Sequence, residues 1–453
     1  MRLAIDPSRM SLLTVSLAGL NTFLSSVFQL LVIYKLGIGR QSDLYYGATV
    51  ATAVVYTLFL DPLSNVLIPM FVQKESQGNN ESSDLLWNAM LMVFLSGVAT
   101  LVVIYFPIRL IFPLIFKSLQ WATPEEIGNV VISYSLYQTL FGAITVKNCY
   151  LFACGKPATA QSNMLVSWII SLALLCGVNI TSDVSRIAYC LVAGHSVGLL
   201  FPNLDRIALS YRNKQFRWHV GELIRRGAPL ASGSAIFKAE SLLDGALASL
   251  FGAGSLTVYQ LFSRMLLSIS TVINSGYIQP VTKHLAESAE QGRWNILRKQ
   301  AARAASWSSA ASMVCLVPLI PILLFLHSRP IQALDIYVRL FERYYAILLL
   351  MLGFLIGASI WKVYATGLFV LRKEHMFAVI CVATFMAGVV LKILGAYSAG
   401  LTGLALGTSL YWILGAACMA AGFCKSLRER KNVVWVRSAE LPSKTTPKFG
   451  SAD

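Results

Sequence analysis

The stretch SAIFKAESLLDGALASLFGAG, residues 234–254, reads as a membrane span that carries ionisable side chains inside it. Both of its ends are apolar enough for a bilayer, yet its middle holds Lys238, Glu240 and Asp244. An ionisable side chain at the centre of a membrane helix costs about 2.5 to 3.5 kcal/mol on insertion scales, so it must face something other than lipid. The stretch therefore predicts a span packed among other helices with a polar surface between them.

The composition of the whole chain agrees with this interpretation. Of 453 residues 56% are apolar and 13% are charged, with a mean hydropathy of +0.64, whereas charged residues make up about 25% of a soluble domain. Hydrophobicity is continuous over runs of about 20 residues, which is the length of a membrane-spanning helix. We expect an all-α, polytopic membrane protein with twelve transmembrane helices, near residues 10–34, 44–73, 86–112, 127–153, 160–181, 185–203, 228–250, 255–282, 301–326, 344–369, 376–397 and 400–424.

The net charge of +16 indicates orientation and not nucleic-acid binding. Most of the 37 Lys and Arg residues fall on the side of the membrane that carries both termini. By the positive-inside rule that side is cytoplasmic, and the charge also favours contact with anionic membrane lipids. The eight cysteines form no C-x-x-C pair and the five histidines are scattered, so no metal site is expected.

Short internal similarities indicate a repeat. Gly39 pairs with Gly254, LFACGKP (residues 151–157) with LFVLRKE (residues 368–374), and Gly194 with Gly407, all at nearly one separation. Six spans separate equivalent positions, so both halves have the same orientation and form a parallel repeat. The predicted organisation is an N-terminal six-helix bundle, a cytoplasmic linker, a C-terminal six-helix bundle and a disordered basic cytoplasmic tail, over residues 1–204, 205–226, 227–424 and 425–453.

The pentapeptide GHSVG, residues 194–198, matches the nucleophile elbow of serine hydrolases, but it lies inside a predicted helix where that elbow cannot form. Gly194 and Gly198 are four residues apart, which is typical of close helix packing, as is GLALG at residues 403–407. His195 is expected to be a buried, hydrogen-bonded histidine. The chain also lacks a P-loop. It is therefore not expected to be an enzyme.

Cations within the spans predict an anionic cargo. Lys147 and Lys362 fall at similar depth in equivalent helices and are expected on opposed walls of a central cavity. Both also lie within two turns of a span end, so the alternative is that they snorkel to the membrane interface. Lys238 lies about 160° round from Glu240 at 100° per residue, so it either lines that cavity or anchors a neighbouring helix. With Arg264 these residues would make the cavity electropositive, which suits a phosphate or pyrophosphate headgroup.

Carboxylates in or beside the spans form a second group of expected site residues. Glu240 and Asp244 are four apart and share a helix face, which we expect to point toward the cavity. Asp61 lies in the second span and Asp43 at its mouth. These groups could hold a coupling proton or Na⁺, or hydrogen-bond sugar hydroxyls, and the sequence leaves the alternatives open. No other cofactor is expected.

Two stretches resemble a known family. LLDGALASLFGAGSLTVYQLFSRMLLSISTVINSGYIQPVTKHLAE (residues 242–287) resembles the seventh and eighth helices of the MurJ/MviN lipid II flippases, and LGIGRQSDLYYGATVATAVVYTLF (residues 36–59) resembles the start of their second helix. The resemblance implies the fold of the MOP exporter superfamily. It also implies that Arg264 binds a lipid-linked diphosphate. Two arginines of the family's first helix are replaced here by Thr22 and Phe28, which favours a paralogue with another polyprenyl-linked saccharide.

The resemblance thus implies a flippase of the bacterial inner membrane that moves a polyprenyl-diphosphate-linked oligosaccharide by alternating access. The cargo would be a peptidoglycan precursor or an exopolysaccharide or O-antigen unit, and proteins of polysaccharide synthesis or polymerisation are candidate partners. Two alternatives stay open. One is a multidrug or organic-cation antiporter of the same fold, and the other is a subunit of a polysaccharide-synthesis complex that does not transport.

Overall fold

The computed structural model describes residues 7–53, 67, 70–71, 79–180, 183–200, 221, 239–273, 278, 281, 285, 288–289, 291–314, 344–371 and 373–440. Throughout these ranges the regular structure is helical. Lys238 and Asp61 lie outside the described residues, so the roles expected for them stay predictions.

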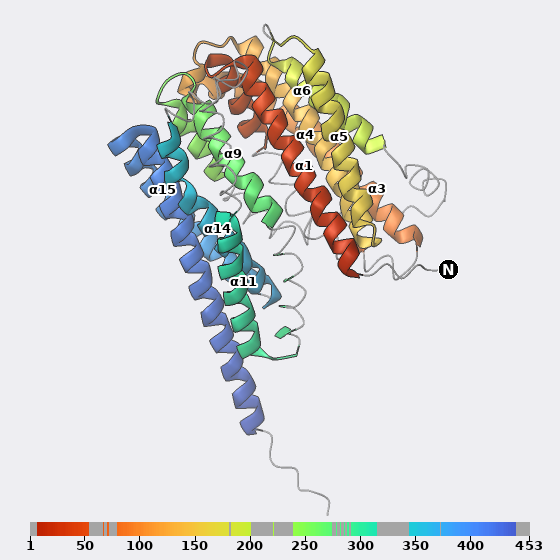
Figure 1. Ribbon diagram of the computed structural model, residues 1–453, viewed down its shortest axis with the longest axis vertical. Coiled ribbons are helices and arrows are strands. Elements are labelled where there is room, and N and C mark those ends of the chain that lie inside the picture. Colours follow the sequence, from red (N-terminus) through yellow and green to blue (C-terminus); the bar gives the residue numbers. More distant parts are fainter. Residues whose placement is uncertain are drawn as a thin grey trace, which may run out of the picture.

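The helices form two groups (Figure 1). The N-terminal bundle contains helical residues 40–53 together with α1 (Pro7–Leu36), α3 (Asn79–Ile115), the short 3-10 helix η1 (Lys117–Leu119), α4 (Pro124–Ala153), α5 (Pro157–Gly177) and α6 (Ser185–Leu200). The C-terminal bundle contains helical residues 239–249 together with α9 (Ser255–Ile273), α11 (Trp294–Val314), α14 (Leu352–Val370) and α15 (Glu374–Glu440).

Local sequence accounts for where some of these helices begin. The Thr123 hydroxyl accepts the Glu126 backbone N–H, and the Glu126 carboxylate in turn accepts the Thr123 backbone N–H. This capping box satisfies donors that the first turn of α4 leaves open, and Pro124 fits because the first helical residue needs no N–H. Pro157 opens α5 in the same way.

The long element α15 is a helical hairpin. Its helical backbone breaks at Ala399 and Gly400, and Gly400 has a φ of +63°, which glycine adopts at little steric cost. The two arms, residues 374–398 and 401–440, pack so closely that a Cβ on Gly407 would lie 2.9 Å from the Leu391 carbonyl oxygen. The prediction that GLALG forms a small packing face is thus confirmed.

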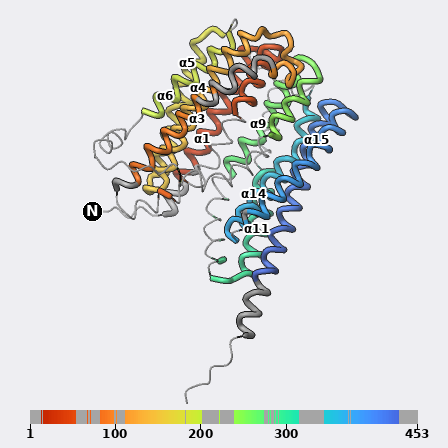
Figure 2. Tube along the Cα trace, turned by 180° about the vertical axis from the view of Figure 1, so that it is seen from behind, coloured from red at the N-terminus to blue at the C-terminus, as the bar shows by residue number. Residues whose placement is uncertain are grey.

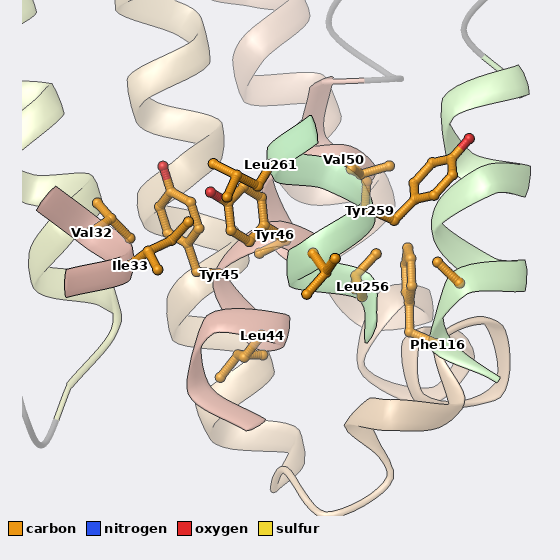
Figure 3. Close-up of a cluster of buried hydrophobic side chains, with 14 of the residues drawn as sticks. Val32, Ile33, Leu44, Tyr45, Tyr46, Val50, Phe116, Leu256, Tyr259 and Leu261 are labelled. Atoms are coloured by element: carbon orange, nitrogen blue, oxygen red, sulfur yellow. The ribbon is translucent and has the colours of Figure 1, made fainter. Parts of the chain in front are cut away.

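The two bundles meet at one end and diverge toward the other (Figures 1 and 2). The amino-terminal end of α1 and the carboxyl-terminal end of α15 both lie at the diverging end. Buried apolar side chains follow this shape. One cluster joins residues of both bundles, among them Tyr46 and Val50 from one and Leu256 and Leu261 from the other (Figure 3). Two further clusters are separate, each confined to its own bundle.

Five helices in the described part of the chain are long and apolar enough to cross a membrane: Ser16–Leu36, Pro157–Gly177, Ser255–Ile273, Tyr344–Val370 and His375–Arg430. The last of these includes the turn between the two arms of α15. The all-helical, multi-pass membrane fold expected from the sequence is therefore confirmed, while the number of twelve spans stays a prediction.

The GHSVG segment lies within α6 and faces α5. A Cβ on Gly194 would lie 2.5 Å from the Ser167 carbonyl oxygen, and a Cβ on Gly198 would lie 2.8 Å from that of Asn163. These distances are too short for any side chain, so both glycines let two helix backbones approach closely. The interpretation of this motif as helix packing is confirmed.

Candidate functional site

The end at which the bundles meet is held by Asp43, whose side chain is fully buried. Its Oδ2 accepts the backbone N–H of Gly254 at 2.9 Å, and its Oδ1 accepts the backbone N–H of Thr257 at 2.9 Å and the Thr257 hydroxyl at 2.6 Å. Aspartate is favoured at this position because the first turn of a helix presents unpaired N–H donors and the positive end of the helix dipole. Asp43 of the N-terminal bundle thus caps α9 of the C-terminal bundle.

Repeat-related turns contact each other at the same place. Ser42 Oγ and Thr257 Oγ1 lie 2.9 Å apart, and the two residues are separated by 215 positions, the spacing of the repeat. Gly254 has a φ of +87°, and a Cβ there would lie 2.9 Å from the Ile38 side chain. Neither the turn nor the contact would accept a larger residue. The backbone N–H of Lys117 adds a third link, to Ser249 Oγ at 3.0 Å.

Arg264 lies farther along α9 and also reaches across to the N-terminal bundle. One of its terminal nitrogens (NH1) donates to Gln29 Oε1 on α1 at 3.1 Å, and its guanidinium carbon lies 4.9 Å from the centre of the Tyr46 ring. Gln29 Oε1 also accepts the Tyr45 hydroxyl at 3.0 Å. Among the residues that the structure describes, Arg264 forms no ion pair with a carboxylate. Within the described part of the chain, neutral and aromatic groups therefore surround its charge.

Lys147 and Lys362, two of the other expected cations, each form a hydrogen bond within their own bundle. Lys362 on α14 donates to Ser270 Oγ on α9 at 3.3 Å, within the C-terminal bundle. Lys147 on α4 is 1% exposed and donates to the Leu199 carbonyl at the end of α6 at 2.8 Å. A lysine at the end of a helix satisfies carbonyls that have no partner in that helix. The hydrogen bond of Lys147 lies within the N-terminal bundle and that of Lys362 within the C-terminal bundle, and a shared cavity wall stays a prediction.

Glu240 and Asp244 both contact Lys392, on the first arm of α15. The Lys392 ammonium nitrogen lies 2.6 Å from Glu240 Oε1 and 2.7 Å from Asp244 Oδ1. Lys392 is visible in the sequence as an ionisable residue in a span, but its partners are not. Helical spacing shows which residues share a face, whereas it does not show which other helix covers that face.

His195 is fully buried on α6. Its Nδ1 lies 2.9 Å from the Leu191 carbonyl oxygen, while its Nε2 has no hydrogen-bond partner in the described part of the protein. The rings of Tyr137, Phe141 and Trp168 pack around it. The expectation of a buried histidine is confirmed, and hydrogen bonding satisfies one of its two nitrogens.

Fold and interface together define the class of protein: a multi-pass membrane protein built from two helical bundles, an architecture that many secondary transporters share. A family model described as "Lipid II flippase MurJ" matches residues 32–442. The chain belongs to this family, and it is a transport protein and not an enzyme. The resemblance seen in the sequence is thereby confirmed.

Solved structures show how widely the fold is shared. A structure described as "Lipid II flippase MurJ, inward closed conformation" has a TM-score of 0.67 at 15% identity, covering 95% of this chain and 93% of that one. An inward-facing multidrug resistance MATE transporter of the MOP superfamily has a TM-score of 0.69 at 12% identity, covering 94% and 99%. No curated protein matches this chain in sequence. Likeness to the solved structures therefore establishes the fold and does not choose between cargoes.

Proposed function

We propose that this protein flips a polyprenyl-diphosphate-linked oligosaccharide from the cytoplasmic to the outer leaflet of the bacterial inner membrane. The observation that carries the proposal is Arg264. It is a partly buried cation between the two bundles, and no carboxylate in the described part of the chain balances it.

An unbalanced arginine in this position favours an anionic cargo. Keeping a guanidinium out of water is costly unless charge and hydrogen bonds compensate it. Its five N–H donors form a planar fork that fits phosphate oxygens bidentately, and the bond to Gln29 uses one of them. A diphosphate headgroup would supply both the negative charge and the acceptors.

The carboxylates that the structure describes argue against an organic-cation antiporter, while Asp61 lies outside the described residues. A cation carrier needs an acidic group that is available to its cargo. Glu240 and Asp244 are engaged by Lys392, and Asp43 is fully buried as the cap of α9. These three expected acidic residues therefore have partners within the protein, although transporters of multidrug resistance share the fold.

The contact at Asp43 supports alternating access. If both termini are cytoplasmic, as the positive-inside rule predicts, the joined ends of the bundles face the outside and the diverging ends face the cytoplasm. Breaking the bonds between Asp43 and α9 would let the bundles separate on the outer side. Transport would then proceed by rocking one bundle against the other around Arg264.

Flipping by purified protein in proteoliposomes tests the proposal. Arg264→Ala should reduce flipping of a polyprenyl-diphosphate saccharide at least tenfold, because a charge-assisted contact of about 1.4 kcal/mol or more is lost. Arg264→Lys should recover part of it, since an ammonium keeps the charge but lacks the fork. Arg303→Ala is the matched control, because Arg303 is exposed on α11. Flipping by Arg264→Ala at the wild-type rate would contradict the proposal.

The same assay separates the cargoes. Lipid II and a lipid-linked exopolysaccharide unit are offered to equal amounts of protein, and cells depleted of their lipid II flippase are tested for rescue. The replacements at Thr22 and Phe28 lead us to expect faster flipping of the exopolysaccharide unit. Rescue of the depleted cells would instead assign lipid II. Flipping of neither substrate, with polysaccharide synthesis lost in a deletion strain, would indicate a subunit that does not transport.

A further inference from the structure

The C-terminal bundle contains a cluster of buried charges that the proposed headgroup contact does not use. Glu240 and Asp244 are each 6% exposed, and Lys392 is 1% exposed. The Lys392 ammonium nitrogen lies 2.6 Å from one carboxylate and 2.7 Å from the other. A single ammonium therefore bridges two carboxylates that stand one helical turn apart.

Further polar groups complete the cluster. The Tyr259 hydroxyl donates to Asp244 Oδ2 at 2.9 Å and lies 2.7 Å from Thr408 Oγ1. The Trp412 indole N–H donates to Glu240 Oε1 at 3.1 Å. The ammonium also lies 4.7 Å from the centre of the Tyr411 ring. Helical residues 239–249, α9 and both arms of α15 thus meet at this cluster.

The position of the ammonium is the position that a dissolved cation would need. Two adjacent buried carboxylates repel each other and lose hydration, so they require a positive charge between them. Carboxylate and hydroxyl oxygens are the ligands that hard metal cations take. Here the charge between them belongs to a side chain of the same protein.

We propose that Lys392 is a built-in counter-ion that occupies the place of a bound monovalent cation between Glu240 and Asp244. The C-terminal bundle then keeps its charge balance without taking Na⁺ from solution. Shortening Lys392 should empty that place and create a Na⁺ site. The consequence for coupling, that flipping needs no Na⁺ at this cluster, rests on the proposed function, whereas the consequence for ion binding does not.

Thermal unfolding of the purified full-length protein tests the ion-binding consequence. The wild-type Tm should be the same in NaCl and in N-methyl-D-glucamine chloride at equal ionic strength. Lys392→Ser should have a lower Tm without Na⁺ and should recover with Na⁺. The expected gain is about 1 to 2 °C for each tenfold rise in Na⁺ above the dissociation constant.

Two variants separate ion binding from general effects. Lys392→Met also removes the charge but fills the space, so its Tm should fall without recovering in Na⁺. Lys373→Ser breaks an ion pair with Glu429 of similar length, 2.9 Å, whose side chains are 34% and 46% exposed. It should show no response specific to Na⁺. An equal Na⁺ response in the Ser and Met variants of Lys392 would indicate stabilisation without a site and would overturn the proposal.

The wild-type protein provides a test that does not depend on any Lys392 variant folding. A rise in its Tm specific to Na⁺ that Glu240→Gln abolishes would overturn the proposal, because the carboxylates would then bind a dissolved ion with Lys392 present. Likewise, Na⁺-dependent flipping by wild-type protein that becomes independent of Na⁺ in Glu240→Gln would overturn the coupling consequence. Neither result depends on Arg264, so failure of the headgroup proposal would be recognised separately.

Discussion

Gly194 shows how much a single methyl group can matter in this protein. A Cβ there would lie 2.5 Å from the Ser167 carbonyl oxygen and 2.8 Å from the Ser171 backbone nitrogen, both on α5. Backbone atoms cannot rotate away, so Gly194→Ala must push α6 off α5. Overpacking of this kind costs about 1 to 3 kcal/mol. We expect a lower Tm for the purified variant by thermal unfolding in detergent.

The control for this prediction is Gly19→Ala. Gly19 also lies inside a helix, α1, but a Cβ there would meet nothing within 4 Å. Its Tm should be unchanged or slightly raised, because alanine favours a helix more than glycine does. If both variants had the same Tm as the wild type, the close approach of α5 and α6 at Gly194 would be disproved.

The sequence predicts the packing of some residues but not the partners that they contact. The spacing of Gly194 and Gly198 predicts close packing, because four-residue spacing places small residues on one face. The sequence does not identify α5 as the partner. The pairing of Glu240 with Lys392, 152 positions away, is hidden for the same reason. Periodicity orients a side chain on its own helix, whereas contacts between distant helices depend on how the whole bundle packs.

Among the elements, α9 is capped by a residue outside its own bundle. Asp43 supplies the acceptor for two backbone N–H groups and one hydroxyl at its first turn. Hydrogen bonds to a charged acceptor contribute about 1.5 to 3 kcal/mol each. Asp43→Ala should therefore favour separation of the bundles at this end. Arg40 and Phe251 are exposed positions near the contact. Spin labels attached to Arg40→Cys and Phe251→Cys should lie farther apart in the Asp43→Ala variant, as measured by double electron–electron resonance.

Asp183→Ala is the matched control for that measurement. Asp183 accepts the Ser185 backbone N–H at 2.9 Å and the Ser185 hydroxyl at 2.5 Å, so it caps α6 within a single bundle. Its removal should leave the distance between the two spin labels unchanged. An unchanged distance in Asp43→Ala as well would contradict the assignment of Asp43 as the residue that joins the bundles.

Helix ends could be predicted where the sequence carries a local signal. The predicted spans 376–397 and 400–424 are separated at the observed turn of Ala399 and Gly400, because a glycine next to a run of small residues marks the break. The predicted start of the eighth span agrees with α9 at Ser255. What the sequence does not reveal is that this start is capped from the other bundle, since Asp43 and Thr257 become neighbours only in the folded protein.

For the whole molecule, composition predicts the membrane class because it averages over many residues, and the shared spacing of three short similarities predicts two bundles. The contact of Ser42 with Thr257 places two repeat-related turns together at the joined end. Orientation in the membrane, like the membrane class, depends on an average over the chain, the distribution of Lys and Arg. It determines whether the joined end faces the outside, and therefore which way the cargo would enter.

Labelling of single cysteines in intact cells tests this orientation. Gln120 follows η1 at the joined end, and Arg298 lies at the start of α11 toward the diverging end; both are exposed. In a background without the native cysteines, a membrane-impermeant maleimide should label Gln120→Cys in intact cells and Arg298→Cys only after permeabilisation. Segments rich in Lys and Arg resist translocation across the membrane, so they should remain in the cytoplasm. The opposite labelling pattern would place the joined end in the cytoplasm, and the direction of access proposed for the diphosphate headgroup would have to be reversed.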